Sequence, residues 1–196
     1  GWEYHLFTAP ENDQFVQDHF PEYLAWYRRL PHKIQQCDAI RYMRLYVHGG
    51  LYLDLDQIVL QDLEPLLLME PGSVTLPETK TAAVDSICPL CNDFLYSPTP
   101  RHTFWMRMME HMCRPAPWWC LTKHFQVMAT TGPVGISKVY QKEKRAGTLG
   151  PCRIVPIPPE FCRPKCHPRL IRRFLRQTLS SPSPDLMWIV WICCRF

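Results

Sequence analysis

The sequence lacks the features that mark several common classes of protein. Charged residues make up only 20% of the 196 residues, which excludes a disordered polyelectrolyte. No Gly-x-Gly-x-x-Gly or Walker loop is present, so a phosphate group would be held by metal and polar side chains rather than by a glycine cradle. The last apolar run, Leu186–Cys194, has about half the length of a membrane-spanning helix. It is compatible with a buried strand, the beginning of a membrane anchor or a mis-spliced tail.

The chain also lacks an initiating methionine and a signal sequence. Its first residue is Gly1, and no charged-then-apolar segment follows. We therefore expect a fragment or a truncated gene model. The 46% hydrophobic content is enough to bury one core, which favours a single domain, and 20 prolines indicate many irregular connections.

Apolar periodicity and turn residues indicate alternating strands and helices, which favours an α/β sheet covered on both faces. Strands are expected near residues 3–7, 51–56, 73–76 and 93–96. Helices are expected near residues 13–27, 35–48, 102–113 and 135–144.

Residues 38–56 are the most informative part of the sequence. Alternation across residues 51–56 puts three leucines on one face of a strand and, on the other, Tyr52, Asp54 and Asp56. Two carboxylates on one side repel each other unless a cation lies between them. Mg²⁺ and Mn²⁺ take oxygen ligands, often one or two carboxylates plus phosphate oxygens and water. The pattern therefore predicts a site for a diphosphate, although a bare Asp-x-Asp on a solvated edge strand would look the same.

The segment before this strand has helical character. Ile40, Met43 and Val47 form an apolar stripe, and Gly49-Gly50 indicates a helix end followed by a tight turn. Asp38 and Arg41 are three residues apart and share a helix face. On this pattern alone they could form an ordinary surface ion pair.

The whole block resembles glycosyltransferase family 32, the sugar transferases with a DXD motif. In that family an Asp-x-x-Arg on a helix is followed by Gly-Gly-x-Tyr-x-Asp-x-Asp on a strand. The matching positions here are Asp38, Arg41, Gly49, Gly50, Tyr52, Asp54 and Asp56.

A second block is similar to the downstream half of the same family. It consists of Asn92-Asp93-Phe94, Pro100-Arg101-His102 with Phe104, and Thr130-Thr131-Gly132-Pro133. These segments resemble the branch that contains yeast outer-chain and inositol phosphoceramide mannosyltransferases. The resemblance covers residues 1–165 and leaves residues 166–196 as a basic and apolar tail. Family members carry an earlier strand, which is missing here.

The resemblance implies an α/β GT-A-like, Rossmann-like fold and a metal-dependent, retaining transfer of a hexose. Asp54 and Asp56 would be the catalytic carboxylates and would hold Mn²⁺ or Mg²⁺. Asp38, Arg41, Tyr52 and Asp54 would bind the donor. The acceptor or sugar pocket would contain Asn92, Asp93, His102, Thr131 and Gly132, although loop capping and turn formation explain these residue types equally well.

The expected donor is a nucleotide sugar, with GDP-mannose favoured by the downstream motifs and a UDP-sugar as the alternative. The acceptor would be a glycan or a glycolipid. A non-catalytic domain that binds a sugar nucleotide is a further alternative. The resemblance implies a place on the lumenal side of the Golgi or another secretory-pathway membrane, with membrane association through termini that are missing here.

Three other sets of residues allow more than one interpretation. A basic run at residues 163–176 could contact phosphates, but a solvated helix face is commoner and we expect no nucleic-acid partner. Among ten cysteines, Cys88 and Cys91 with Cys162, Cys166 and His167 could bind zinc, while disulfides suit a secretory protein and Cys37 is expected as a buried thiol. Sugar stacking is conceivable for three tryptophans, but core packing is expected for Trp105, Trp118 and Trp119.

Overall fold

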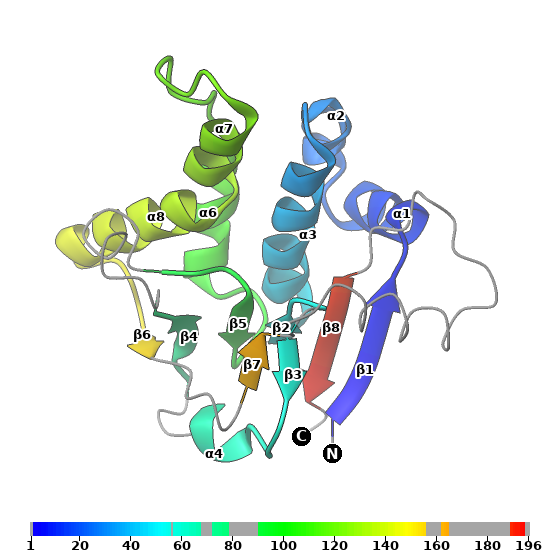
Figure 1. Ribbon diagram of the computed structural model, residues 1–196, viewed down its shortest axis with the longest axis vertical. Helices are drawn as coiled ribbons and strands as arrows, with labels where there is room; N and C mark the ends of the chain where they lie inside the picture. The colour runs from blue at the N-terminus through cyan, green and yellow to red at the C-terminus, as the bar shows by residue number, and fades with distance from the viewer. Residues whose placement is uncertain are drawn as a thin grey trace.

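The computed structural model describes residues 2–55, 57–67, 72–78, 90–155, 162–164 and 189–194. The main feature of this part is a six-stranded mixed sheet with the order β1-β8-β2-β5-β4-β6 (Figure 1). Only β4 and β6 pair in parallel, and the other neighbours are antiparallel. The strands span Trp2–Phe7 (β1), Gly50–Leu53 (β2), Val74–Pro77 (β4), Phe94–Ser97 (β5), Cys152–Val155 (β6) and Ile189–Cys194 (β8).

A small second sheet pairs β3 (Gln57–Val59) with β7 (Cys162–Pro164). The helices are α1 (Ala9–His19), α2 (Pro21–Arg29), α3 (Lys33–His48), α4 (Glu64–Leu67), α6 (Thr103–Met112), α7 (Lys123–Thr130) and α8 (Pro133–Ala146). No helix in these described ranges is long and apolar enough to cross a membrane.

The longer helices lie together on one side of the large sheet, toward the top of the view, and α4 lies on the opposite side, at the bottom (Figure 1). A large apolar core joins residues of α1, α2, α3, α6 and α8 to Tyr52 and Leu95 on the sheet. Leu51 and Leu53 face a second, smaller cluster with Leu67 of α4. The predicted alternation along β2 is confirmed for these residues, because Tyr52 packs on the face opposite to the two leucines.

The short connection between α3 and β2 requires glycine. Gly49 has a φ of +69°, a left-handed conformation that side chains with a Cβ rarely adopt. A Cβ at this position would also approach the carbonyl oxygen of Ser97 at 3.1 Å. The Gly-Gly pair therefore turns the chain directly from the end of α3 into the strand that leads to Asp54.

Three sequence expectations differ from the structure. The single helix expected over residues 13–27 is two helices, because Phe20 leaves the helical conformation and Pro21 begins α2. The acidic strand was expected to continue to residue 56, but β2 ends at Leu53. Helix α7 was not expected at all, although Thr122 caps it by accepting a hydrogen bond from the Phe125 amide.

The α/β fold class is confirmed, with a qualification about the sheet. A Rossmann-like sheet would be mostly parallel, whereas β8 here runs antiparallel between β1 and β2. Of the three possibilities for the last apolar run, the structure places residues 189–194 in a strand of the sheet.

Candidate active site

The chain places Asp54 immediately after β2 and holds it there through its backbone. The Asp54 amide donates to the carbonyl oxygen of Asp93 at 2.9 Å, and its own carbonyl accepts from the Gln57 amide at 2.9 Å. The Gln57 side chain also donates to the Asp93 carboxylate at 2.7 Å. These bonds connect the end of β2 to the segment before β5, so Asp54 lies beside the Asn-Asp motif.

Arg41 is the centre of the polar cluster, although it is only 4% exposed. Its Nη2 lies 2.9 Å from Oδ1 of Asp38, and its Nη1 lies 3.4 Å from Oδ1 of Asp54. Nη1 also donates to the carbonyl oxygen of Asn92 at 2.6 Å. The guanidinium carbon is 4.6 Å from the centre of the Tyr52 ring, which adds a cation–π contact. One side chain therefore connects α3, β2 and the loop before β5.

Asp38 is also buried, at 4% exposure, and accepts hydrogen bonds from other elements. The Thr131 hydroxyl donates to its Oδ2 at 2.8 Å, and the Asn92 amide group donates to its Oδ1 at 3.3 Å. The Tyr42 hydroxyl donates to the carbonyl oxygen of Thr131 at 2.7 Å and accepts from Asn92 at 3.2 Å. The ion pair expected from the i, i+3 spacing exists, but it is a buried, hydrogen-bonded pair and not a surface one.

Burial and charge act in opposite directions in this cluster. Burial raises the pKa of Asp38 to about 6, while Arg41 and the hydrogen bonds from Thr131 and Asn92 limit the rise. Burial disfavours the charge of Arg41, but the surrounding acidic groups hold its pKa above the ordinary value. Burial also raises the pKa of Tyr52, so its hydroxyl stays protonated and donates to Oδ1 of Asp54. At neutral pH the cluster is therefore an ionised pair supported by neutral donors.

Asp54 is more accessible than the buried ion pair, since its side chain is 32% exposed while those of Asp38 and Arg41 are 5% exposed. Asp56 lies outside the described residues. Among the residues that are described, no group of three histidines, cysteines or acids could hold a metal. Asp54 nevertheless fits a hard cation that takes one or two protein carboxylates and completes its shell with phosphate and water.

The structure brings together most of the predicted site residues, and their roles stay predictions. Gly132 follows Thr131 and is the N-cap of α8, where a Cβ would crowd the Val127 carbonyl oxygen and the Met128 backbone at 3.1 Å. The residues in or directly beside the cluster are Asp38, Arg41, Tyr52, Asp54, Asn92, Asp93, Thr131 and Gly132.

His102 is the described candidate that the structure does not bring to this cluster. It caps α6 by accepting a hydrogen bond from the Phe104 amide at 3.2 Å. It follows the end of β5 where Ser97 pairs with Gly50, and this is the end of β2 opposite to Asp54. Burial lowers its pKa, which keeps the imidazole neutral at pH 7.

Two positioning residues were missed from the sequence. Tyr42 lies one helical turn after Asp38, a spacing that could have indicated a shared face, but its packing partner Thr131 is 89 residues away. Gln57 fixes Asp93 and directly follows the Asp-x-Asp motif. Neither residue type signals such a role by itself.

The other sequence candidates have mixed outcomes. Cys37, Cys91, Cys113, Cys120 and Cys152 form no disulfides. Cys37 is a free thiol as expected but is half-buried and not fully buried, and burial raises its pKa to about 11. Cys88, Cys166, His167 and most of the basic run lie outside the described residues. Core packing is confirmed for Trp105, which is fully buried, and is wrong for Trp118 and Trp119, which are exposed.

Comparison with known proteins agrees with the motifs that form this cluster. Residues 2–72 match the family described as "Glycosyltransferase sugar-binding region containing DXD motif". This matched region of the chain belongs to the family of DXD-motif glycosyltransferases. Asp38, Arg41, Tyr52 and Asp54 all lie within the matched region.

Two curated relatives extend the similarity beyond that region. Mannosyl phosphorylinositol ceramide synthase CSH1 of Saccharomyces cerevisiae is 31% identical over 144 residues, which are 74% of this chain and 35% of that protein. Inositol phosphoceramide mannosyltransferase 2 of Schizosaccharomyces pombe is 31% identical over 160 residues, 82% of this chain and 41% of that protein. The chain thus spans well under half the length of these relatives.

Among solved structures, PaToxG Glycosyltransferase matches with a TM-score of 0.42 and 14% identity, covering 68% of this chain and 52% of that chain. The mixed α/β architecture is the one expected from the family match of residues 2–72.

Proposed function

We propose that this chain is the catalytic region of a metal-dependent, retaining glycosyltransferase that moves a hexose from a nucleotide sugar to a glycolipid. The observation that carries the proposal is the buried Arg41, which joins the Asp-x-x-Arg motif of α3 to the Asp-x-Asp motif after β2. The names of the two relatives support mannose as the hexose and an inositol phosphoceramide-like lipid as the acceptor. We therefore favour GDP-mannose as the donor over a UDP-sugar.

In this proposal Asp54 and Asp56 hold Mn²⁺ or Mg²⁺. When bound, the cation would act as a Lewis acid and neutralise the departing diphosphate. The chain contributes the orientation of Asp54, because the Tyr52 hydroxyl and Arg41 both engage Oδ1. Preorganised charge at the reacting groups is usually the largest single contribution to enzyme catalysis.

Asp38 and Arg41 are best suited to positioning. Their side chains are nearly fully buried, and each is already bonded to several partners. Direct contact with a donor, as the family resemblance implies, would require some of these bonds to be exchanged. We assign them the task of fixing Asp54 and the Asn92–Asp93 segment, which would form the wall of the sugar pocket.

The test is release of GDP or UDP from a panel of sugar nucleotides, measured with Mn²⁺, with Mg²⁺ and with chelator. We expect GDP-mannose to be turned over only with a divalent cation, and Asp54→Asn to reduce turnover by roughly a hundredfold or more. Asp18→Asn is the matched control, since Asp18 is an exposed acid of α1 that accepts a hydrogen bond from the nearby Gln14 side chain.

Each other outcome has a definite meaning. If only UDP-sugars are turned over, the donor is a UDP-sugar and not GDP-mannose, and the assignment of the site stands. Metal-dependent donor binding without turnover in a folded protein would support the non-catalytic alternative. Turnover that is equal in Asp54→Asn and in the parent would reject the assignment.

We also propose that the activity faces the lumen of the Golgi or another secretory-pathway membrane, as the proposed glycolipid acceptor suggests. Protease protection of an epitope-tagged protein in intact microsomes tests this location. Digestion without detergent would contradict it.

A further inference from the structure

A group of large apolar side chains is exposed where the chain enters α7. Trp118 is 89% exposed, Leu121 84%, Phe125 52% and Trp119 47%. These four residues, named here the apolar tip, belong to the α6–α7 loop and the first turn of α7, which project away from the large sheet (Figure 1). Exposure of four large apolar side chains within eight residues is unusual and marks an interaction surface.

The apolar tip belongs to an ordered part of the chain. Cys120 is 4% exposed, and its amide donates to the Pro117 carbonyl oxygen at 2.9 Å. Further along α7, the Thr130 hydroxyl accepts from the buried side chain of Gln35 on α3 at 3.0 Å. The segment that carries the apolar tip is therefore anchored to the rest of the fold, and the four apolar side chains are exposed to solvent.

The stretch of sequence that carries the apolar tip has only positive charge. No Asp or Glu occurs between Glu110 and Glu143, and the charged residues in this stretch are Arg114, Lys123, Lys138 and Lys142. All four are exposed. A surface that combines exposed aromatic rings with positively charged side chains fits a partner that has apolar and anionic parts.

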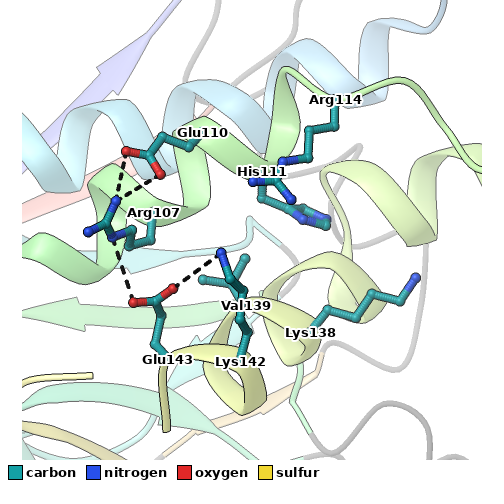
Figure 2. Close-up of a pocket in the computed structure, with 8 residues that line it drawn as sticks. All are labelled: Arg107, Glu110, His111, Arg114, Lys138, Val139, Lys142 and Glu143. Carbon is teal, nitrogen blue, oxygen red and sulfur yellow. Dashed lines mark hydrogen bonds and ion pairs between the residues drawn. The ribbon is translucent and has the colours of Figure 1, made fainter. Parts of the chain in front are cut away.

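Three of these cations, Arg114, Lys138 and Lys142, line a cavity of about 230 Å³ between α6 and α8. Figure 2 shows the side chains that line it. The acids of the cavity are engaged within it, because Arg107 binds Glu110 at 3.0 Å and Glu143 at 3.6 Å. Lys142 lies 3.8 Å from Glu143, whereas no ion pair with a described residue is recorded for Arg114 or Lys138. The side chains that line this basic cavity include Arg107, Glu110, Arg114, Lys138, Lys142 and Glu143.

The basic cavity and the apolar tip are parts of one surface. Lys138 lines the cavity, and its ammonium nitrogen lies 5.5 Å from the centre of the Trp119 ring. A single ligand surface could therefore contact both at once. None of these residues belongs to the Asp38–Arg41–Asp54 cluster.

We propose that the apolar tip and the basic cavity dock the protein onto an anionic phospholipid bilayer. Tryptophan, leucine and phenylalanine side chains enter the boundary between headgroups and acyl chains, where amphipathic tryptophan rings are favoured. Arg114, Lys138 and Lys142 attract the negatively charged lipid surface, and the cavity accepts a headgroup phosphate. The inference rests on exposure and charge and does not depend on the proposed activity.

The test is sedimentation of the protein with vesicles of phosphatidylcholine alone or mixed with phosphatidylserine. We expect binding to the mixed vesicles, and weaker binding by about tenfold or more for Trp118→Ser combined with Leu121→Ser. The control is Leu60→Ser, because Leu60 is a 44% exposed leucine that directly follows β3, a strand that lies far from α7 in Figure 1. This control should bind like the parent.

A second variant tests the charges separately. Lys138→Gln with Lys142→Gln should weaken binding to the mixed vesicles by about fivefold for each cation removed, and should leave any binding to neutral vesicles unchanged. Circular dichroism melting confirms that each variant is folded. The proposal is overturned if the folded Trp118→Ser, Leu121→Ser protein binds like the parent, or if phosphatidylserine makes no difference.

Discussion

The buried cluster around Arg41 and the surface formed by the apolar tip and the basic cavity use similar side chains in opposite ways. Arg41 is 4% exposed, lies over the Tyr52 ring and has protein partners on several sides. Trp118 and Lys138 instead present a ring and a cation to solvent. A side chain whose interactions are satisfied within the fold serves to position other groups. A side chain that is left exposed is available to a partner.

The largest expected effect comes from removing the buried cation. Arg41→Leu leaves Asp38 buried with its charge uncompensated, so the free energy of unfolding should fall by about 3–5 kcal/mol. Lys142→Gln removes a cation whose side chain is 64% exposed, and it should change the free energy of unfolding by less than about 0.5 kcal/mol. Urea denaturation measures both. Equal losses would mean that the two regions do not differ in how their cations are used.

Tyr52→Phe tests whether the cluster orients Asp54. The variant removes the hydroxyl that donates to Oδ1 of Asp54 and keeps the ring beneath Arg41. A ligand carboxylate that has lost its supporting donor typically binds metal about ten- to a hundredfold more weakly. We therefore expect the Mn²⁺ concentration for half-maximal turnover to rise by this factor in Tyr52→Phe. It should not change in Tyr4→Phe, because Tyr4 is 69% exposed. An unchanged Mn²⁺ requirement would show that the hydroxyl does not support a metal ligand.

Asp38 should give the site an acid limit near pH 6. Burial raises the pKa of this carboxyl from 3.8 to about 6, so its charge is present above pH 6 and lost as the pH falls through that value. Protonation weakens its hold on Arg41, and turnover at pH 5 should be about tenfold below turnover at pH 7. Asp38→Asn should be less active but should lose this limb, whereas Asp18→Asn should keep it. A limb that persists in Asp38→Asn belongs to another group.

The two regions also differ in how well the sequence predicts them. Local periodicity predicted α3, the strand at β2 and the opposite faces of Leu51 and Tyr52, because these patterns depend on neighbours in the chain. It could not distinguish a surface pair from the buried pair of Asp38 and Arg41. That distinction depends on Asn92 and Thr131, which lie more than 50 residues away in the chain.

The same limit explains the other misses. The place of β8 between β1 and β2 is a long-range pairing that no local signal encodes. Core packing was the reasonable expectation for Trp118 and Trp119, since residue type predicts average burial but not the exceptions. The family motifs predicted the membership of the cluster better than the periodicity did, except at His102, which caps α6 at the far end of β2.

The smallest expected effect separates buried from surface ion pairs by their response to salt. Arg28 donates to Asp13 at 2.9 Å in an exposed pair, and Arg28→Gln should cost only a little folding stability at low ionic strength. Raising the salt from about 0.1 M to about 1 M shortens the Debye length from about 10 Å to about 3 Å, which should remove most of that cost. The loss caused by Arg41→Leu should stay within about 0.5 kcal/mol of its low-salt value, because water and ions do not reach a pair whose side chains are 5% exposed. If salt reduced both losses equally, Asp38 and Arg41 would be solvated in solution, and the positioning role argued for them would fail.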